Sequence, residues 1–370
     1  MVALFAVLLT SQAAEEYGMT FIRIQEKPWL FISISLSKLI VQLSLNIWLV
    51  VVKDMGVLGV ALSSAISGAS FALLLTLYTL SKTGLTISKK AAAKMFGFCW
   101  PLWIGSLAAI YIGSGNRYYM KQFSSLEDIG FFELATKLSS ILAVIIWQPF
   151  AQTWQTERFK IYQQNDALKT YQNIFSFISS LMLLACLGIS IYADPIISIM
   201  AAPEFAPAIK AVPLLTLAAV FAHLTFFCNF SFHVSEQTKS ISKNNYLMAF
   251  IITPLYLLLI PFGGYIGAAM AMLIAAIIHF VIVLITSKKY YDMQLRLRPL
   301  LISLGIVTGF YTASVALTSD SHLWIKLTVN TLIIIAAVAA VLIQHWLDPA
   351  TKDSLIIIKN KLSNSVKANS

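Results

Sequence analysis

Long apolar segments separated by short polar turns run along almost the whole chain. Eleven of these segments approach the ~20 apolar residues that a helix needs to cross a membrane. The expected ranges are 1–23, 29–52, 55–80, 95–118, 127–154, 170–193, 207–233, 244–261, 263–287, 299–318 and 322–346. This pattern predicts an all-α, polytopic membrane protein with about 11 transmembrane helices.

The composition supports the same class, because only 11% of the 370 residues are charged and 58% are hydrophobic. A soluble domain carries about 25% charged residues. Cys99, Cys186 and Cys228 lie within apolar segments without CxxC spacing, so no metal is expected. The chain also lacks HExxH, GxSxG and Walker sequences. The sequence therefore predicts neither an enzyme nor a cofactor.

Basic residues concentrate in every second loop and in the C-terminal tail. This set holds 19 of the 26 Lys and Arg residues: Arg23, Lys27, Lys82, Lys89, Lys90, Lys94, Arg158, Lys160, Lys169, Lys239, Lys243, Lys288, Lys289, Arg296, Arg298, Lys352, Lys359, Lys361 and Lys367. Cytoplasmic loops of membrane proteins are enriched in Lys and Arg, so these loops and the C-terminus are expected in the cytoplasm. Topology thus accounts for the net charge of +10, and no nucleic-acid partner is expected.

One short pattern occurs twice, as GVLGVA from Gly56 and as GYIGAA from Gly264. Each copy opens an apolar helix on the expected outer side, and each helix ends in Ser-Lys on the cytoplasmic side. Small-xxx-small patterns, such as Gly264 with Ala268, are also common wherever membrane helices pack closely. Because both copies point the same way, they predict two helical bundles related as a parallel repeat.

The repeat gives an expected domain organisation. Residues 1–80 would be the last three helices of an incomplete N-terminal bundle, and 81–94 a basic cytoplasmic linker. Residues 95–287 would form a complete six-helix bundle, 299–346 a terminal helix pair and 349–370 a basic cytoplasmic tail. Projecting the second half back onto the first predicts three further helices before residue 1. The chain is therefore expected to be a fragment, a truncated product or the product of a misassigned start.

Few ionisable residues lie within the apolar segments, where each costs roughly 2.5–3.5 kcal/mol on insertion scales. Glu15, Glu16 and Lys38 lie at similar depths in the first helical hairpin. They are interpreted either as a neutralising pair or as the wall of a cavity that carries both signs of charge.

Helix 127–154 carries a polar face, because Glu133, Lys137, Ser140 and Gln148 recur at helical spacing. Glu133 and Lys137 are expected to form an i,i+4 ion pair. The face is interpreted either as a polar seam against a neighbouring helix or as a cavity lining with Lys137 near mid-membrane.

Several short segments resemble the polysaccharide-exporter branch of the multidrug/oligosaccharidyl-lipid/polysaccharide (MOP) superfamily, which includes Wzx-like O-antigen flippases. The segments are Asn116-Arg117-Tyr118-Tyr119, Ile129-Gly130-Phe131-Phe132, Ala135-Thr136-Lys137-Leu138, Pro203-Glu204-Phe205-Ala206-Pro207 and Gly264-Tyr265-Ile266-Gly267-Ala268-Ala269. That family usually has Asp-Arg where this chain has Asn116-Arg117, so no ion-pair or proton-coupled role is expected at position 116.

The resemblance implies a transporter in the bacterial inner membrane. It would flip a polyprenyl-diphosphate-linked oligosaccharide, such as an O-antigen, capsule or exopolysaccharide repeat unit, by alternating access. Expected partners are this substrate, membrane lipids and polysaccharide assembly proteins. The candidate substrate-binding residues are Arg117, Lys137, Lys38, Glu133, Asn116 and Gln148. Cations at such positions stabilise a diphosphate, and Arg grips it with two hydrogen bonds.

Three other functions are weighed. A cation-coupled drug or small-molecule antiporter of the same superfamily would need uncompensated carboxylates, whereas Lys38 and Lys137 are cations. A membrane glycan polymerase would be expected to carry a large outer loop, and the longest one here spans only about 194–206. An inactive fragment is the remaining alternative.

Overall fold

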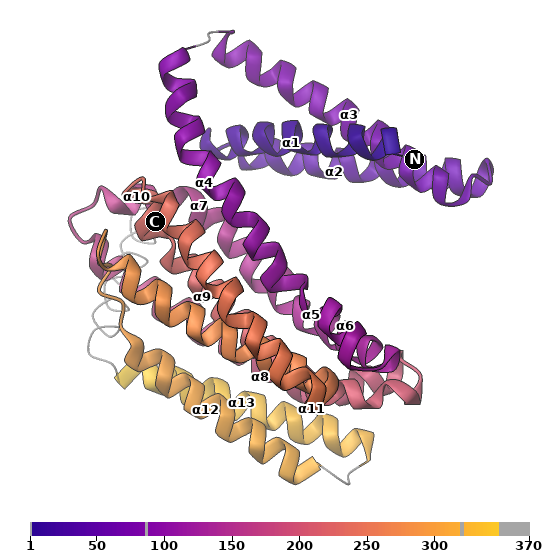
Figure 1. Ribbon diagram of the computed structural model, residues 1–370, viewed down its shortest axis with the longest axis vertical. Helices are drawn as coiled ribbons and strands as arrows, with labels where there is room; N and C mark the ends of the chain where they lie inside the picture. The colour runs from indigo at the N-terminus through magenta and orange to yellow at the C-terminus, as the bar shows by residue number, and fades with distance from the viewer. Residues whose placement is uncertain (1, 86–87, 319–321, 348–370) are drawn as a thin grey trace, which may run out of the picture. The chain divides into compact units, whose positions relative to one another are not determined.

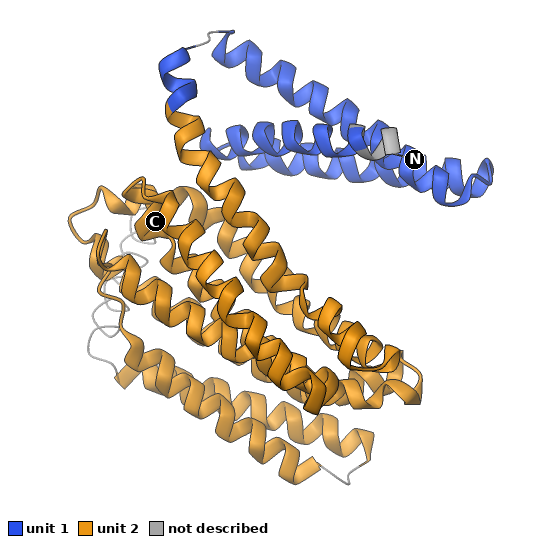
Figure 2. Ribbon diagram, viewed as in Figure 1, with its two compact units in different colours: residues 1–93 blue, residues 94–370 orange. Residues whose placement is uncertain are grey.

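The computed structural model describes residues 2–85, 88–318 and 322–347. Within these ranges the chain forms helices joined by short turns, and it contains no strand. The chain divides into two compact units, residues 1–93 and 94–370 (Figure 2). The expected tail, 349–370, lies outside the described residues.

Unit 1 is built from three long helices (Figure 1). They are α1 (Val2–Ile24), α2 (Pro28–Asn46) with its π-helical extension η1 (Ile47–Val52), and α3 (Gly56–Thr83). α1 packs mainly along α3. A Cβ added at Gly18 would lie 2.7 Å from Leu75 Cβ, and one at Gly68 would lie 3.1 Å from Ser11 Oγ. Glycine therefore permits the close approach of these two helices, as is typical within membranes.

Unit 2 contains the rest of the chain, from residue 94 onward (Figure 1). Its helices are α4 (Lys89–Ser114, whose first turn lies in unit 1), α5 (Asn116–Phe123), α6 (Leu126–Leu142), η2 (Ala143–Trp147), α7 (Gln148–Tyr162), α8 (Ala167–Met200), η3 (Pro203–Ala211), α9 (Val212–Cys228), α10 (Phe230–Val234), α11 (Thr238–Ser287), α12 (Leu297–Thr318) and α13 (Leu323–Leu347).

Helix occupies all 11 expected ranges, which confirms the predicted fold class. Nine helical segments of the described chain are long and apolar enough to cross a membrane, and α1 is not one of them. The 50-residue α11 counts once, although it contains two of the expected helices, which meet at the non-helical Gly264 (φ 51°, ψ −130°). The expected linker 81–94 is helical up to Thr83 and again from Lys89.

The terminal helices α12 and α13 lie along one side of unit 2, against α8 (Figure 1). Buried Asn330 of α13 accepts a hydrogen bond from Ser314 (2.7 Å) and donates one to the Ile191 carbonyl (2.9 Å). Lys326 forms an ion pair with Asp194 of α8. These contacts connect the terminal pair to α8 in the same unit.

The basic loops of unit 2 meet at one end of the helices. Lys94 pairs with Glu236 at 2.8 Å, and Thr238 Oγ1 donates to the Phe98 carbonyl at 2.9 Å. Gln172 Nε2 donates to the Gln294 carbonyl at 3.0 Å. The loops therefore alternate between two ends, as the charge pattern predicts. That the basic end is cytoplasmic stays a prediction.

Two turns have the same backbone geometry in the two units. Glu26 and Glu236 both follow a helix and both have φ near 55°. In each turn the Glu amide donates to the carbonyl three residues earlier (3.0 and 3.2 Å), and the next amide donates to the carbonyl five residues before it (3.4 and 2.8 Å). These paired bonds close a helix end by the Schellman arrangement. Further along, Gly56 and Gly264 also share a φ of 51°, which glycine adopts without strain.

The second glycine of each repeated pattern lies against backbone. A Cβ added at Gly59 would be 3.1 Å from the Leu49 carbonyl oxygen. A Cβ added at Gly267 would overlap the Leu259 carbonyl. Both leucines belong to the helical segment that precedes the pattern, so each GxxG closes a tight helical hairpin.

We therefore expect Gly267→Ala to destabilise unit 2, because the methyl group forces the two halves of α11 apart. Overpacking of this kind costs about 1–3 kcal/mol. The matched control is Gly263→Ala, since an added Cβ there meets nothing within 4 Å. Thermal unfolding of the detergent-purified protein should show a lower Tm for Gly267→Ala alone. Equal Tm values for the two variants would contradict the packing assigned to Gly267.

Candidate functional site

The residues of the predicted polar face lie along α6, η2 and α7. Lys137, Ser140 and Gln148 are exposed in unit 2, and Glu133 is partly buried. The π-helical turn η2 directly precedes α7, whose second residue is Pro149. Proline lacks an amide hydrogen and clashes with the carbonyl four residues earlier, so it favours a widened turn at this point. Such π-helical turns are frequent at functional sites.

A short turn brings α5 against the start of α6. Ser125 caps α6, because its hydroxyl accepts a hydrogen bond from the Asp128 amide at 3.1 Å. Arg117 of α5 thereby lies beside Glu133, and its guanidinium makes two hydrogen bonds to the carboxylate, at 2.5 and 3.1 Å. Arg matches a carboxylate with two parallel donors, which a lysine cannot do.

This ion pair corrects the sequence-based expectation for Glu133. The i,i+4 spacing predicted a pair with Lys137, but Glu133 binds Arg117 instead. Among the described residues Lys137 forms no ion pair. The structure therefore leaves one cation of the polar face uncompensated.

Asn116 does not share the exposed face of Arg117. It is 1% exposed, and its Nδ2 lies 3.1 Å from Met272 Sδ in α11. Its Oδ1 has no hydrogen-bond partner among the described residues. Asn116 thus points into the helix bundle, where it provides a free acceptor.

A cavity of about 420 Å³ lies beside the polar face, between α4, α6, α9 and α11. Its walls are mostly alanine and other apolar side chains, with polar groups from Thr136, Ser139, Ser140, His223 and His279. Thr136 Oγ1 and the Nε2 atoms of both histidines are buried without a partner among the described residues. Buried polar atoms are usually paired, so this cavity presents several groups ready to hydrogen-bond a polar ligand.

The sequence pattern does not indicate the two histidines as site residues. They lie on different helices, α9 and α11, and only the fold brings both to one cavity. The ring of His223 stacks on Trp147 of η2, with centroids 4.7 Å apart. The sequence shows each of them only as a single histidine within a long apolar segment. That pattern does not indicate which residues lie next to it in the fold.

Lys38 lies in unit 1 and is compensated. Its Nζ contacts both carboxylate oxygens of Glu15, at 2.7 and 2.8 Å. Glu16 pairs instead with Arg23 at 2.6 Å. The interpretation of Glu15 and Lys38 as a neutralising pair therefore agrees with the geometry.

Arg158, which the charge pattern assigns to a loop, is buried near the end of α7, with 8% of its surface exposed. Its guanidinium lies over the rings of Phe159 and Phe230, at 5.1 and 5.5 Å from their centroids. Its Nε and Nη1 have no hydrogen-bond partner in the described chain. Cation–π contacts take the place of a counter-ion here.

These features define a multi-pass α-helical membrane protein with a polar face and a partly polar cavity within its helices. A family profile described as "polysaccharide biosynthesis protein" matches residues 1–210. The chain belongs to this polysaccharide biosynthesis family, as the resemblance implied.

One solved structure is similar in fold, that of the lipid II flippase MurJ in an inward closed conformation. The TM-score is 0.55 at 15% sequence identity, and the match covers 86% of this chain and 69% of that chain. No curated protein matches the sequence.

The polar face should be in contact with water, and adjacent serines provide a matched test. Ser140 is exposed, whereas Ser139 is 4% exposed and bonded to the Ala135 carbonyl. In a background without the native cysteines, Ser140→Cys should react with a membrane-impermeant maleimide and Ser139→Cys should not. Thiols react as thiolates, which require water. An unreactive Ser140→Cys in folded protein would place this face in lipid and rule out an aqueous path along it.

Proposed function

We propose that this protein moves a polyprenyl-diphosphate-linked oligosaccharide across the bacterial inner membrane by alternating access. The family assignment and the MurJ-like fold support transport of a lipid-linked glycan precursor. The substrate would be the repeat unit of an O-antigen, capsule or exopolysaccharide. The C-terminus would be cytoplasmic, and polysaccharide assembly proteins would be partners.

The observation that carries the proposal is the uncompensated amine of Lys137. Lys137 lies 11 residues after the start of α6, which is roughly 16 Å along the helix axis at 1.5 Å per residue. A charged side chain at such a depth costs about 2.5–3.5 kcal/mol and usually faces a wet cavity or a partner. Among the described residues it has no carboxylate partner, and a diphosphate supplies the missing negative charge.

The neighbouring groups would divide the binding of the substrate. Lys137 attracts the diphosphate as a point charge, and Arg117 would join it by exchanging Glu133 for a phosphate oxygen. Glu133 meanwhile neutralises Arg117 when no substrate is bound. Gln148 and Ser140 would hydrogen-bond sugar hydroxyls further along the face. Asn116 and Lys38, which are directed to other partners, would support the helices rather than contact the diphosphate.

The shared turns of the two units support the proposed parallel repeat. α1 to α3 would correspond to the segment from η3 to the end of α11, with matching geometry at the Glu turns and at the GxxG patterns. Two bundles of this kind rocking about a central path are the structural basis of alternating access.

The antiporter alternative has less support from the geometry. A cation exporter needs carboxylates that are free to bind its substrate. Here Glu15 and Glu133 are both bound to basic side chains.

Replacing Lys137 should reduce export without preventing insertion. A hydrogen bond to a charged group contributes about 1.5–3 kcal/mol, so Lys137→Gln should lower delivery of surface polysaccharide roughly tenfold or more. Lys137→Arg keeps the charge and should have a smaller effect. The measurement is surface polysaccharide per amount of membrane-inserted protein, in cells that depend on this transporter.

Lys121→Gln is the matched control. Lys121 is an exposed lysine at the end of α5, and this substitution removes the same charge as Lys137→Gln. It should leave export unchanged. Normal export by Lys137→Gln at equal abundance would exclude Lys137 from substrate binding. A uniform loss in both variants would instead indicate a general effect of charge.

A further inference from the structure

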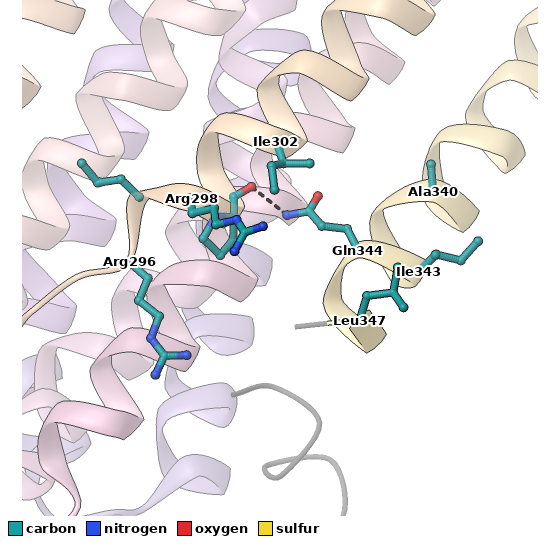
Figure 3. A pocket seen from close by; sticks show the side chains of 9 residues that line it. Arg296, Arg298, Ile302, Ala340, Ile343, Gln344 and Leu347 are labelled. Carbon is teal, nitrogen blue, oxygen red and sulfur yellow. Dashed lines mark hydrogen bonds between the residues drawn. The ribbon is translucent and has the colours of Figure 1, made fainter. Parts of the chain in front are cut away.

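A groove of about 720 Å³ lies between the start of α12 and the end of α13, away from the polar face (Figure 3). We propose that this groove binds an anionic phospholipid. The lipid phosphate would contact Arg296 and Arg298, and an acyl chain would lie along the apolar wall. This inference does not depend on the proposed transport function.

The cationic rim of the groove lacks counter-ions. Among the described residues neither Arg296 nor Arg298 forms an ion pair. The nearby carboxylate of Asp292 accepts a hydrogen bond from the Gln294 amide at 2.8 Å. The first turn of α12 contains no acidic residue, although a helix start favours negative charge. The rim is therefore a site of uncompensated positive charge.

The groove is held in shape by hydrogen bonds at its base. Gln344 of α13 donates from Nε2 to the Pro299 carbonyl at 2.8 Å, and its Oε1 accepts from Ser303 at 3.0 Å. Figure 3 shows the Arg298 side chain next to this connection between the two helices. Because both polar atoms of the Gln344 side chain are engaged within the protein, the arginines are the groups left to bind an anion.

The wall beside the arginines is apolar and open. Ile302, Ile343 and Leu347 are 41%, 56% and 66% exposed, and Ala340 completes this side of the groove. A soluble phosphate compound would fill the cationic rim but leave this wall uncovered. A lipid satisfies both parts, because its phosphate and its acyl chain are joined across the same polar–apolar boundary.

The position along the helices fits the same ligand. α12 begins at Leu297, so the two arginines lie where a spanning helix meets a polar loop. Lipid phosphates lie at this depth in a bilayer, and basic residues near an anionic surface attract its lipids. We therefore choose an anionic phospholipid, rather than a free phosphate, as the occupant.

Native mass spectrometry of the full chain in detergent tests the proposal, with phosphatidylglycerol and phosphatidylcholine as probes. The intact protein should retain phosphatidylglycerol in preference to phosphatidylcholine. The double variant Arg296→Gln/Arg298→Gln should weaken retention roughly tenfold or more. The double variant Lys288→Gln/Lys289→Gln is the control, because it removes two exposed charges just before the groove but outside its lining. It should bind as the unmodified protein does.

Competition experiments distinguish the occupants. Inorganic phosphate at equal concentration should not displace phosphatidylglycerol, and Ile343→Ser should weaken lipid retention without altering the arginines. Displacement by phosphate, or unchanged binding by Ile343→Ser, would overturn the lipid assignment. Equal losses in the arginine and lysine variants would overturn the site itself. Preferential binding of a polyprenyl phosphate over phosphatidylglycerol would also overturn the assignment, and would identify the occupant as a lipid of the transported class.

Discussion

The interior of a bilayer contains no water to hydrogen-bond the backbone, and the rest of the structure depends on this constraint. Every described segment that is long enough to span is helical, and the chain reverses direction in short turns. Glycine is needed where a reversal brings two helices into backbone contact, as at Gly267 against Leu259. The repeated GxxG pattern is thus a consequence of packing two antiparallel helices closely, at two places in the chain.

Because the bilayer interior also disfavours charge, each ionisable side chain within the helices needs a compensating partner or a wet surrounding. Glu15 with Lys38, Glu133 with Arg117, and Asp194 with Lys326 place opposite charges together within or near the spanning helices. Each pair lowers the cost of inserting its helices, and this is a sufficient explanation for the Glu15–Lys38 and Asp194–Lys326 pairs. Lys137 differs because it forms no ion pair within the described chain. Pairing therefore distinguishes charges that are already compensated within the protein from Lys137, the cation of the polar face that is not.

Hydropathy predicted the helices well, because the thickness of the bilayer fixes how long an apolar segment must be to span it. Helical periodicity also placed Lys137, Ser140 and Gln148 on one exposed face. Periodicity predicted the wrong partner for Glu133. The partner is Arg117 because the turn at Ser125 places α5 beside the start of α6, and spacing within α6 does not reveal this. Periodicity also missed that His223 and His279 lie at one cavity, because they are 56 positions apart in the sequence, on α9 and α11.

The cavity and the polar face extend the argument from electrostatics to shape. Thr136 and Ser140 of α6 line the cavity, and Lys137 lies between them in sequence on the same helix. Three alanines of α9 and two of α11 keep the walls of the cavity short. Small side chains at these positions keep the cavity open, whereas larger ones would fill it by packing. α6 therefore carries an uncompensated cation on its exposed side and borders an open cavity through Thr136 and Ser140, and a bulky anionic head group needs both attraction and space to pass between helices.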